Sequence, residues 1–230
     1  MRGFFFKYVF EFVVIVFGIS VSFQFDQYYQ EVQKRDLKNQ SLNRILKNIE
    51  IDREDQLLNI KIHQIGINSI DYISSNFNNQ KVSRVKFGKE LSNSIFTNTI
   101  FVDNQEEYRS LQNSGLIEKI ENDSLVFNLQ RKYSSHSFYK QLEQRMYDFA
   151  DDRLTNFYYN NTEDVDSIES TIYFINNGRV FRGKLPLDRY YVEVLKDKKM
   201  FHQFYISSIK SLISRDSILI EQIKKEIELK

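Results

Sequence analysis

The sequence predicts an all-α protein in which one N-terminal transmembrane helix continues into an elongated helical bundle. Turn-forming residues are scarce, with 7 Gly and 1 Pro in 230 residues, which is too few for a sandwich or barrel of many short strands. Apolar residues recur at helical intervals over most of the chain. One uninterrupted apolar run near the N-terminus has the length of a membrane span. Together these observations favour long helices over sheets.

The apolar run covers residues 8–25, in which Glu11 is the only charged residue. As a helix that rises about 1.5 Å per residue it would extend about 27 Å, close to the roughly 30 Å thickness of the bilayer hydrocarbon. Lys7 precedes Glu11 by four residues, so the two side chains share a helix face and can partly neutralise each other near one interface. We expect residues 1–27 to form a membrane anchor and residues 28–230 to form an extramembrane helical domain.

A stripe of side chains along this helix is a candidate packing face. Glu11, Ile15, Gly18 and Ser22 recur at spacings of three and four, which places them on one side. The small pair Gly18 and Ser22 lets a second backbone approach closely, and a carboxylate at membrane depth prefers a partner to lipid. We predict contact with another transmembrane helix, from a second copy or a partner protein. The alternative is that Glu11 is solvated beside Lys7 and the small residues have no role.

The residues that flank the span are typical of membrane interfaces, where aromatic and polar side chains meet the headgroups. The candidates for these positions are Lys7, Tyr8, Gln24 and Tyr28.

Two other interpretations of the apolar run remain open. The first is a cleaved signal peptide, with Arg2 and Lys7 as its basic region and residues 20–22 as a small-x-small cleavage site. Glu11 inside the apolar region and the bulky Phe23 after the site are both unusual for such a peptide. The second is a core helix of a soluble protein, since short apolar runs can be either. A spanning helix accounts best for the length of the run.

Residues 8–28 resemble the opening signature of an uncharacterised family of bacterial single-pass membrane proteins with a domain of unknown function. The signature contains Glu, six mostly aliphatic residues, Gly, three residues, Ala, one residue, Gln, one residue and Asn-Asn-Trp, after a leading Tyr. Glu11, Gly18 and Gln24 fall in register, Tyr8 matches the leading aromatic residue, and Ser22, Asp26 and Tyr28 are mild departures. Residues 46–49 and 114–125 are also similar to family segments. The resemblance implies an uncleaved anchor and a helical domain, and it supplies no catalytic residues.

The charges around the span favour one orientation. Arg2, Lys7 and the free amine favour a cytoplasmic N-terminus, although Lys34, Arg35 and Lys38 follow the other end. Long domains translocate largely regardless of such charges. We therefore expect a single-pass protein of the bacterial cytoplasmic (inner) membrane with a periplasmic domain.

The helix that leaves the membrane is expected to run to about Asn76, because no Pro precedes Pro186 and no Gly lies between Gly18 and Gly66. Its extramembrane part would reach roughly 70 Å, a length that usually requires a bundle or coiled-coil partner. The apolar stripe is too irregular for a strict heptad, and a break near Asp52 or Gly66 is an alternative.

Shorter helices are expected to follow, and caps and periodicity predict their limits. Asp103 with Glu106 signals the start of one helix and Gly115 its end, and Asp123 the start of another. Pro186 signals a helix start, and Asp197 begins a last helix that lies antiparallel to the first. The expected helices cover residues 87–96, 104–114, 116–120, 123–159, 187–195 and 198–228.

Residues 171–185 are the least helical part of the chain, because an Asn-Asn-Gly turn separates two apolar runs. A small hairpin is the predicted structure. Arg179, Arg182 and Lys184 form a basic patch there, which is either a solvated surface or a contact with anionic headgroups.

The sequence contains no recognisable catalytic constellation. The 230 residues lack Cys, which excludes thiolate metal sites and cysteine nucleophiles. His63, His136 and His202 lie far apart, without the spacing of metal ligands on one helix. A net charge of +1 does not provide the field of a dedicated nucleic-acid binder. We predict no enzyme activity, no catalytic residue, no cofactor, no metal and no nucleic acid partner.

Two remaining motifs have plain explanations. The acidic clusters Asp151-Asp152 and Glu163-Asp164-x-Asp166 lack the Gly turn and ligand order of a calcium loop, so a solvated face is expected. The Walker-like spacing of Gly178, Gly183 and Lys184 lacks the following Ser or Thr and is coincidental.

The predicted function is therefore that of a membrane-anchored structural or interaction protein in a bacterial envelope assembly, with the lipid bilayer and another transmembrane helix as partners. The alternative is a sensor-like ectodomain that binds a small ligand between its helices. That alternative predicts a buried pocket lined by polar groups between residues 125–159 and residues 198–228.

Overall fold

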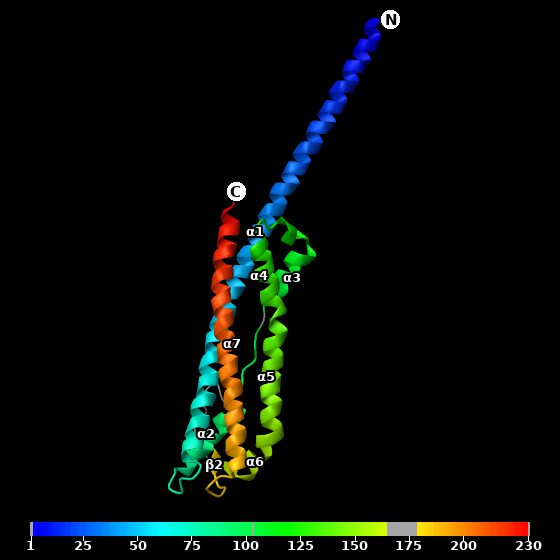
Figure 1. Ribbon diagram of the computed structural model, residues 1–230. Coiled ribbons are helices and arrows are strands. Elements are labelled where there is room, and N and C mark those ends of the chain that lie inside the picture. The colour runs from blue at the N-terminus through cyan, green and yellow to red at the C-terminus, as the bar shows by residue number, and fades with distance from the viewer. Residues whose placement is uncertain (1, 103, 165–178, 230) are drawn as a thin grey trace.

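The computed structural model describes residues 2–102, 104–164 and 179–229. Its described part is all-α apart from one pair of short strands, which confirms the predicted fold class. Figure 1 shows an elongated bundle from which the N-terminal part of α1 projects alone. Helix α1 (Arg2–Asn76) and helix α7 (Arg189–Glu228) pack along each other in opposite directions, as the sequence predicts for the first and last helices.

Helix α1 is continuous for 75 residues, or about 110 Å at the usual rise per residue. It ends at the predicted residue, where the backbone turns and the N–H of Asn79 donates to the carbonyl of Asn76 over 3.0 Å. The alternative breaks do not occur. Asp52 and Gly66 both lie inside the helix, where they contact other parts of the bundle.

The next helices are close to their predicted limits. Helix α2 (Arg84–Phe96) begins after Ser83, whose side chain caps the N–H of Lys86. Helix α3 (Glu106–Asn113) begins two residues later than predicted, and the proposed cap Asp103 lies outside the described residues. Gly115 ends this segment with a φ of +71°, a conformation that glycine adopts without strain. A short 3-10 turn, η1 (Leu116–Lys119), follows.

The single helix predicted for residues 123–159 is wrong in one respect, because the chain breaks at Ser135. Helix α4 (Asp123–Ser134) starts after Asn122, whose side chain caps the N–H of Leu125 in place of the predicted cap Asp123. At the break, the hydroxyl of Ser135 donates to the carbonyl of Lys132 over 2.7 Å, so a side chain takes an acceptor that the helix would use. Helix α5 (His136–Ala150), the π-helical turn η2 (Asp151–Thr155) and helix α6 (Asn156–Asn160) complete the segment.

The two helices predicted after Pro186 are one helix, α7. The carboxylate of Asp188 caps its start by accepting from the N–H of Tyr190 over 2.8 Å. Asp197 is an exposed residue within α7, so its carboxylate is solvated there without ending the helix.

The hairpin predicted within residues 171–185 is wrong in its strand pairing. Strand β2 (Arg179–Phe181) lies inside residues 171–185, but its antiparallel partner is β1 (Thr162–Asp164). The predicted Asn-Asn-Gly turn lies outside the described residues. Within the pair, Thr162 is opposite Phe181 and Glu163 is opposite Val180.

Strand β2 packs closely on α2 at Gly88, and this contact predicts a strong effect of substitution. A Cβ at Gly88 would lie 2.2 Å from the carbonyl oxygen of Arg179 and 2.9 Å from the amide nitrogen of Phe181. Backbone atoms cannot move aside as a flexible side chain can. We expect Gly88→Ala to destabilise the protein by about 1–3 kcal/mol through overpacking. Gly18→Ala is the matched control for the stability of the bundle, because Gly18 lies in the projecting part of α1 and its Cβ would meet no atom of this chain within 4 Å. Chemical denaturation measures both, and equal midpoints would contradict the close packing.

Within the part of the chain that the structure describes, the core is divided into three apolar clusters along the bundle. The cluster near the point where α1 leaves the bundle contains Leu42, Ile49, Leu129 and Leu219. The middle cluster contains Phe101, Tyr139, Met146 and Tyr205. The far cluster contains Ile70, Phe87, Phe181 and Leu195. Buried polar groups lie at intermediate positions along the same helices, so apolar and polar layers alternate.

Candidate functional site

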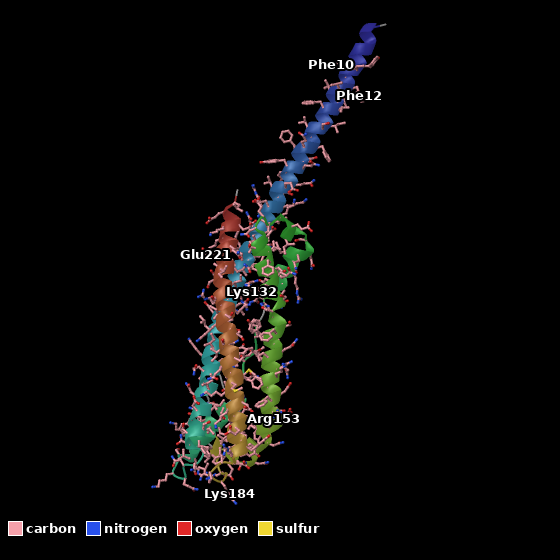
Figure 2. The ribbon with its side chains drawn as sticks, in the orientation of Figure 1. Phe10, Phe12, Lys132, Arg153, Lys184 and Glu221 are labelled. Carbon is pink, nitrogen blue, oxygen red and sulfur yellow. The ribbon has the colours of Figure 1, made fainter. Side chains whose placement is uncertain are left out.

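The projecting part of α1 carries exposed apolar side chains. Among the described residues, this is the one helix that is long and apolar enough to span a membrane, with a mean hydropathy of 1.9 over an 18-residue window. None of that window is buried against the rest of the protein. Figure 2 shows Phe10 and Phe12 extending from this segment, and they are 69% and 66% exposed. The observation separates this helix from a core helix, whose apolar residues would be covered.

The predicted packing stripe borders a shallow hollow of about 530 Å³ on this segment. The hollow is lined by Val14, Ile15, Gly18, Ile19, Ser22, Phe23 and Asp26. Glu11 lies outside this hollow, and its Oε1 is 4.0 Å from the Nζ of Lys7, as the spacing predicts. The predicted interface residues Tyr8, Gln24 and Tyr28 are exposed. The stripe thus has free surface at the position where the sequence predicts a second helix.

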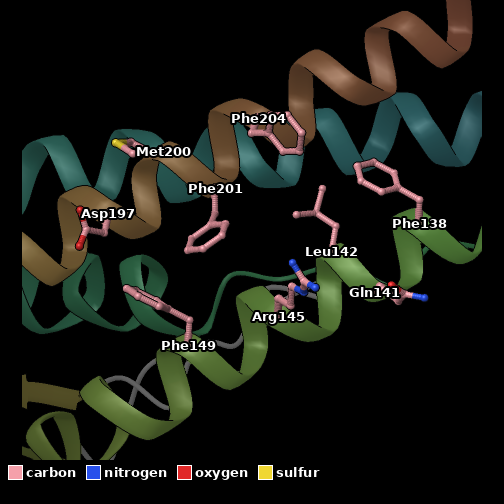
Figure 3. Close-up of a pocket in the computed structure, with 9 residues that line it drawn as sticks. All are labelled: Phe138, Gln141, Leu142, Arg145, Phe149, Asp197, Met200, Phe201 and Phe204. Carbon is pink, nitrogen blue, oxygen red and sulfur yellow. The ribbon is translucent and has the colours of Figure 1, made fainter.

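A groove of about 720 Å³ lies between α5 and α7 (Figure 3). Its lining is mostly apolar, with four Phe, one Leu and one Met, and with three polar residues among them. The lining residues are Phe138, Gln141, Leu142, Arg145, Phe149, Asp197, Met200, Phe201 and Phe204. The groove lies between the two segments named for the sensor-like alternative. It is open and apolar, whereas the sequence predicts a buried pocket with a polar lining.

Aromatic pairs join the two walls of the groove. Phe138 and Phe204 meet at one end with ring centroids 6.3 Å apart, and Phe149 and Phe201 meet further along at 5.3 Å. Leu142 and Arg145 lie between these pairs on α5 (Figure 3). Large aromatic side chains from both helices therefore give the groove defined walls and ends.

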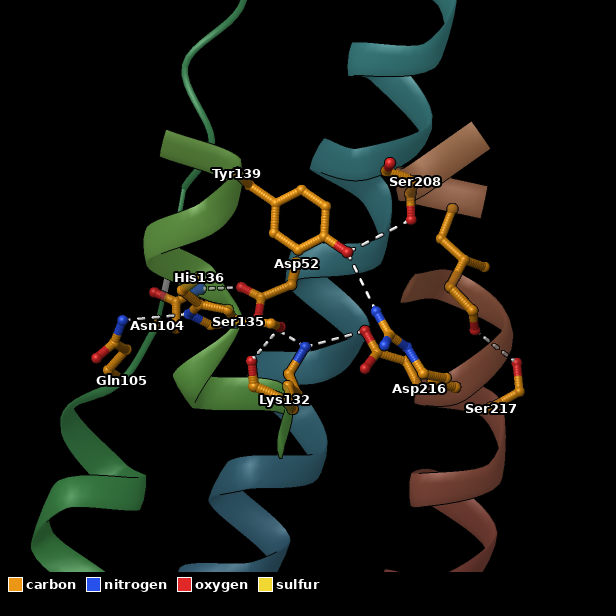
Figure 4. Close-up of polar contacts among 12 residues, drawn as sticks. Asp52, Asn104, Gln105, Lys132, Ser135, His136, Tyr139, Ser208, Asp216 and Ser217 are labelled. Atoms are coloured by element: carbon orange, nitrogen blue, oxygen red, sulfur yellow. Dashed lines mark hydrogen bonds and ion pairs between the residues drawn. The ribbon is translucent and has the colours of Figure 1, made fainter. Parts of the chain in front are cut away.

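A second group of polar residues is buried inside the bundle (Figure 4). The Nζ of Lys132 on α4 lies 2.9 Å from Oδ2 of Asp216 on α7 and 3.6 Å from Oδ2 of Asp52 on α1. The three side chains are 3%, 1% and 2% exposed. Asn104 donates a further hydrogen bond to Asp52. Burial raises the pKa of Asp52, while Lys132 and the bond from Asn104 lower it. One ammonium group thus joins three helices.

A similar contact lies where α1 leaves the bundle. The Nζ of Lys38 is 2.7 Å from Oε1 of Glu226, and both side chains are buried. The same carboxylate accepts from the N–H of Glu121 over 3.0 Å and from the N–H of Asn122 over 3.3 Å. Glu226 therefore connects α7 to α1 and to the start of α4.

The structure brings together two histidines that are isolated in the sequence. Nδ1 of His63 on α1 is 2.7 Å from Nδ1 of His202 on α7, and Nε2 of His63 is 2.9 Å from Oγ1 of Thr99. The hydroxyl of Thr99 donates to Oε1 of Glu143 over 2.7 Å, and Tyr205 donates to the same oxygen over 2.6 Å. A continuous chain of hydrogen bonds therefore runs from His202 to the carboxylate of Glu143.

The proton positions in this chain follow from the number of donors, with Glu143 as the final acceptor. Thr99 uses its only proton toward Glu143, so Nε2 of His63 must be the donor to Thr99. A neutral imidazole carries one N–H, and Nδ1 of His63 therefore accepts from Nδ1 of His202. Nε2 of His202 then carries no proton, and it has no hydrogen-bond partner among the described residues.

Burial keeps both histidines neutral. Burial and the charge of Lys198 lower the pKa of His63 to about 3, and the same causes, together with His63, lower the pKa of His202 to about 2. Burial also lowers the pKa of Lys198 to about 7, and its ammonium donates to the carbonyl of Ile95. Desolvation thus dominates the electrostatics of this layer.

The other candidate chemistry of the sequence is placed as follows. Among the described residues, no group of three or more His, Asp or Glu side chains could hold a metal ion. Asp151 and Asp152 are exposed, and so are Glu163 and Asp164, while Asp166 of the second acidic cluster lies outside the described residues.

The predicted basic patch is partly used inside the protein. Arg179 donates to the hydroxyl and carbonyl of Thr162, and Arg182 pairs with Glu163 over 2.9 Å. Lys184 is exposed. Two of the three cations therefore support the strand pair.

The sensor-like alternative placed a pocket between these two segments but named none of the lining residues, although one signal for them was present. Met200, Phe201, Phe204 and Tyr205 are too many large apolar residues for one buried face of α7. Tyr205 is buried in the core, while Met200 and Phe204 are 65% and 53% exposed and line the groove. The excess apolar width of a helix is thus the pattern that indicates a second surface.

Comparisons of the chain with family models, with curated proteins and with solved structures find no match. The resemblance of residues 8–28 to a family of single-pass membrane proteins stays a prediction.

Proposed function

We propose that this protein is a membrane-anchored helical interaction protein, a single-pass component of a bacterial envelope assembly. The observation that carries the proposal is the apolar, uncovered segment of α1, which has no packing partner among the described residues. Exposed Phe, Ile and Val side chains at this density are costly in water, and a bilayer covers them. The charges at the N-terminus support a cytoplasmic N-terminus and a periplasmic bundle.

The proposal assigns contacts rather than chemistry to the protein. In the bilayer, the stripe of Glu11, Ile15, Gly18 and Ser22 packs against a transmembrane helix of a second copy or of a partner. Outside it, α1 continues without interruption into the bundle, so the anchor and the bundle share one rigid element. The buried ion pairs of Lys38 with Glu226 and of Lys132 with Asp52 and Asp216 stabilise a fixed register between α1 and α7.

Single cysteines test the packing stripe without background, because the chain has no cysteine of its own. Ser22→Cys places a thiol on the stripe, and Ser20→Cys is the matched control two residues away on the opposite side of the helix. In native membranes we expect a bismaleimide to cross-link the Ser22→Cys protein to itself or to one partner at least fivefold more than the Ser20→Cys protein. Equal cross-linking at both positions would contradict the packing face.

Membrane fractionation tests the anchor itself. We expect the full chain to stay in the membrane pellet after alkaline carbonate extraction. Recovery in the supernatant, or a mature chain that begins near Phe23, would contradict the proposal and favour the signal peptide interpretation.

The groove between α5 and α7 favours a second candidate function, a ligand-binding ectodomain. Its volume lies within the range of about 300–1,000 Å³ that is typical of small-molecule sites, and its lining is apolar with few polar groups. Binding of a small molecule there is compatible with the anchor and with the packing stripe.

A further inference from the structure

We propose that the groove between α5 and α7 binds an apolar molecule that carries one carboxylate, and that Arg145 is the partner of this carboxylate. The inference rests on the second candidate function and names its class of ligand.

The apolar part of the ligand is inferred from the walls of the groove. Six of its nine lining residues are Phe, Leu or Met, and Phe138, Met200 and Phe204 are exposed on a folded domain that has a buried core elsewhere. Phe138 and Phe149 are 11 residues apart on α5, so the groove is about 16 Å long at the usual helical rise. An elongated apolar body of a few rings or a short chain fits this shape.

The charge of the ligand is inferred from Arg145. Figure 3 shows its side chain on α5, between Leu142 and Phe149 in the lining of the groove. Arg145 is an exposed residue of the groove lining, and its guanidinium forms no ion pair with another described residue, so it is open to a ligand that enters from solvent. A guanidinium beside aromatic walls matches a planar carboxylate in a bidentate geometry.

Asp197 gives the site a direction. It lies on α7 near Met200, at the end of the groove that Phe149 borders. Its carboxylate repels an anion at that end, so the anionic group of the ligand stays at Arg145. The apolar body then extends toward Phe138, Leu142 and Phe204 at the other end.

The backbone next to the groove is also unusual. The π-helical turn η2 (Asp151–Thr155) follows α5 directly after Phe149 and Ala150, and such turns are frequent at functional sites. Arg153 in this turn lies 4.6 Å over the ring of Phe149. The contact fixes one wall of the groove in place.

Methionine methyl groups allow a direct test with the full chain in lipid nanodiscs. The protein has 3 Met residues, of which Met200 lines the groove and Met146 is buried in the core. With ¹³C-methyl-methionine, we expect 4-phenylbutanoate to shift the Met200 signal in a saturable way and to leave Met146 in place. The probe is soluble, and empty nanodiscs correct for its partition into lipid.

Two variants and one neutral probe test the carboxylate. Arg145→Gln should weaken 4-phenylbutanoate binding about tenfold, the factor expected for the loss of one charged hydrogen-bonded pair. Asp197→Asn should strengthen it, because it removes a repulsive charge. The alcohol 4-phenylbutan-1-ol should bind both the wild type and Arg145→Gln with equal affinity. Met146 and the circular dichroism of each variant report on the fold.

Results that would contradict the ligand site can be distinguished from results that would contradict the membrane anchor. An unmoved Met200 signal at saturating probe, or acid binding that Arg145→Gln leaves unchanged, would overturn the proposed ligand class. So would equal affinity of the wild type for the acid and the alcohol. None of these outcomes changes carbonate extraction or cross-linking at Ser22, which test the membrane function separately.

Discussion

Lys132→Met is expected to destabilise the bundle by about 3–5 kcal/mol, because it removes the only cation from a buried group that contains two carboxylates. Asp216 and Asp52 lie 2.9 Å and 3.6 Å from the Nζ of Lys132. Without the lysine, both carboxylates remain in the interior and repel each other. Urea denaturation of the full chain in mild detergent, followed by circular dichroism, measures the change in the free energy of unfolding.

Two controls separate charge from size. Lys196→Met removes an exposed cation that pairs with Glu193 at 52% and 51% exposure, and it should cost less than about 1 kcal/mol. The triple variant Lys132→Met, Asp52→Asn, Asp216→Asn removes all three charges and should recover much of the lost stability. If Lys132→Met cost no more than Lys196→Met, the buried ion pair would not stabilise the bundle.

The stability of the bundle is expected to fall steeply below pH 6.5 because His63 and His202 are buried and neutral. In the unfolded chain a histidine titrates near pH 6.5, whereas burial lowers the pKa of His63 to about 3 and that of His202 to about 2 in the folded protein. Between these pH values the unfolded state binds more protons than the folded state. The stability that the two histidines provide is therefore complete above pH 6.5 and is lost as the pH falls.

The expected size of this effect is about 4 kcal/mol between pH 7 and pH 5, since each histidine contributes about 1.4 kcal/mol per pH unit below its unfolded pKa. That loss is a large part of the 5–15 kcal/mol that is typical of a folded domain. Glu143 and Asp55 act in the opposite direction, because burial raises the pKa of each carboxyl and acid then favours the folded state. The net slope is therefore smaller than the contribution of the histidines alone.

The difference between variants isolates the histidines. The variant His63→Gln, His202→Gln keeps amide hydrogen-bonding groups at both positions but cannot titrate in this range. Its unfolding free energy should change much less between pH 7 and pH 5 than that of the wild type, whatever its stability at pH 7. If the unfolding free energies of the two proteins changed equally with pH, the histidines would be solvent-accessible or already charged in the folded protein. Lys198 interferes little, because its pKa of about 7 in the folded protein places most of its effect on stability above pH 7, and the lysine is present in both proteins.

The extended helices could be predicted because their signals are local. The absence of Pro, the gap without Gly between Gly18 and Gly66, and the helical period of apolar residues predicted that α1 runs to Asn76. The break at Ser135 depends on a single hydrogen bond from its hydroxyl, which the period of apolar residues does not reveal. The two helices predicted around Asp197 are one helix because an exposed Asp can be solvated inside α7, and the apolar period does not reveal this either. The pairing of β2 with Thr162–Asp164 is a choice between neighbours that turn signals alone do not decide.

The buried polar layers could not be predicted as sites, because their members are far apart in the chain. His63 and His202 are separated by 139 residues and meet only when α1 and α7 pack in register. One signal was nevertheless available. Lys132 follows Leu125 and Leu129 by seven and three residues, and Lys198 follows Leu195 by three, so both lysines occupy positions of an apolar stripe. A cation at such a position indicates a buried partner.

The continuity of α1 sets a distance as well as a direction. Ile60 on α1 packs in the same cluster as Phe201, which lines the groove, and 35 residues separate Ile60 from Phe25 at the end of the apolar run. At about 1.5 Å per residue, the groove stands about 50 Å along α1 from the edge of the proposed span. A lipid that stays in the bilayer cannot reach so far. The ligand proposed for the groove must therefore arrive from the aqueous compartment. The length of α1 keeps the groove far from the proposed packing stripe in the membrane.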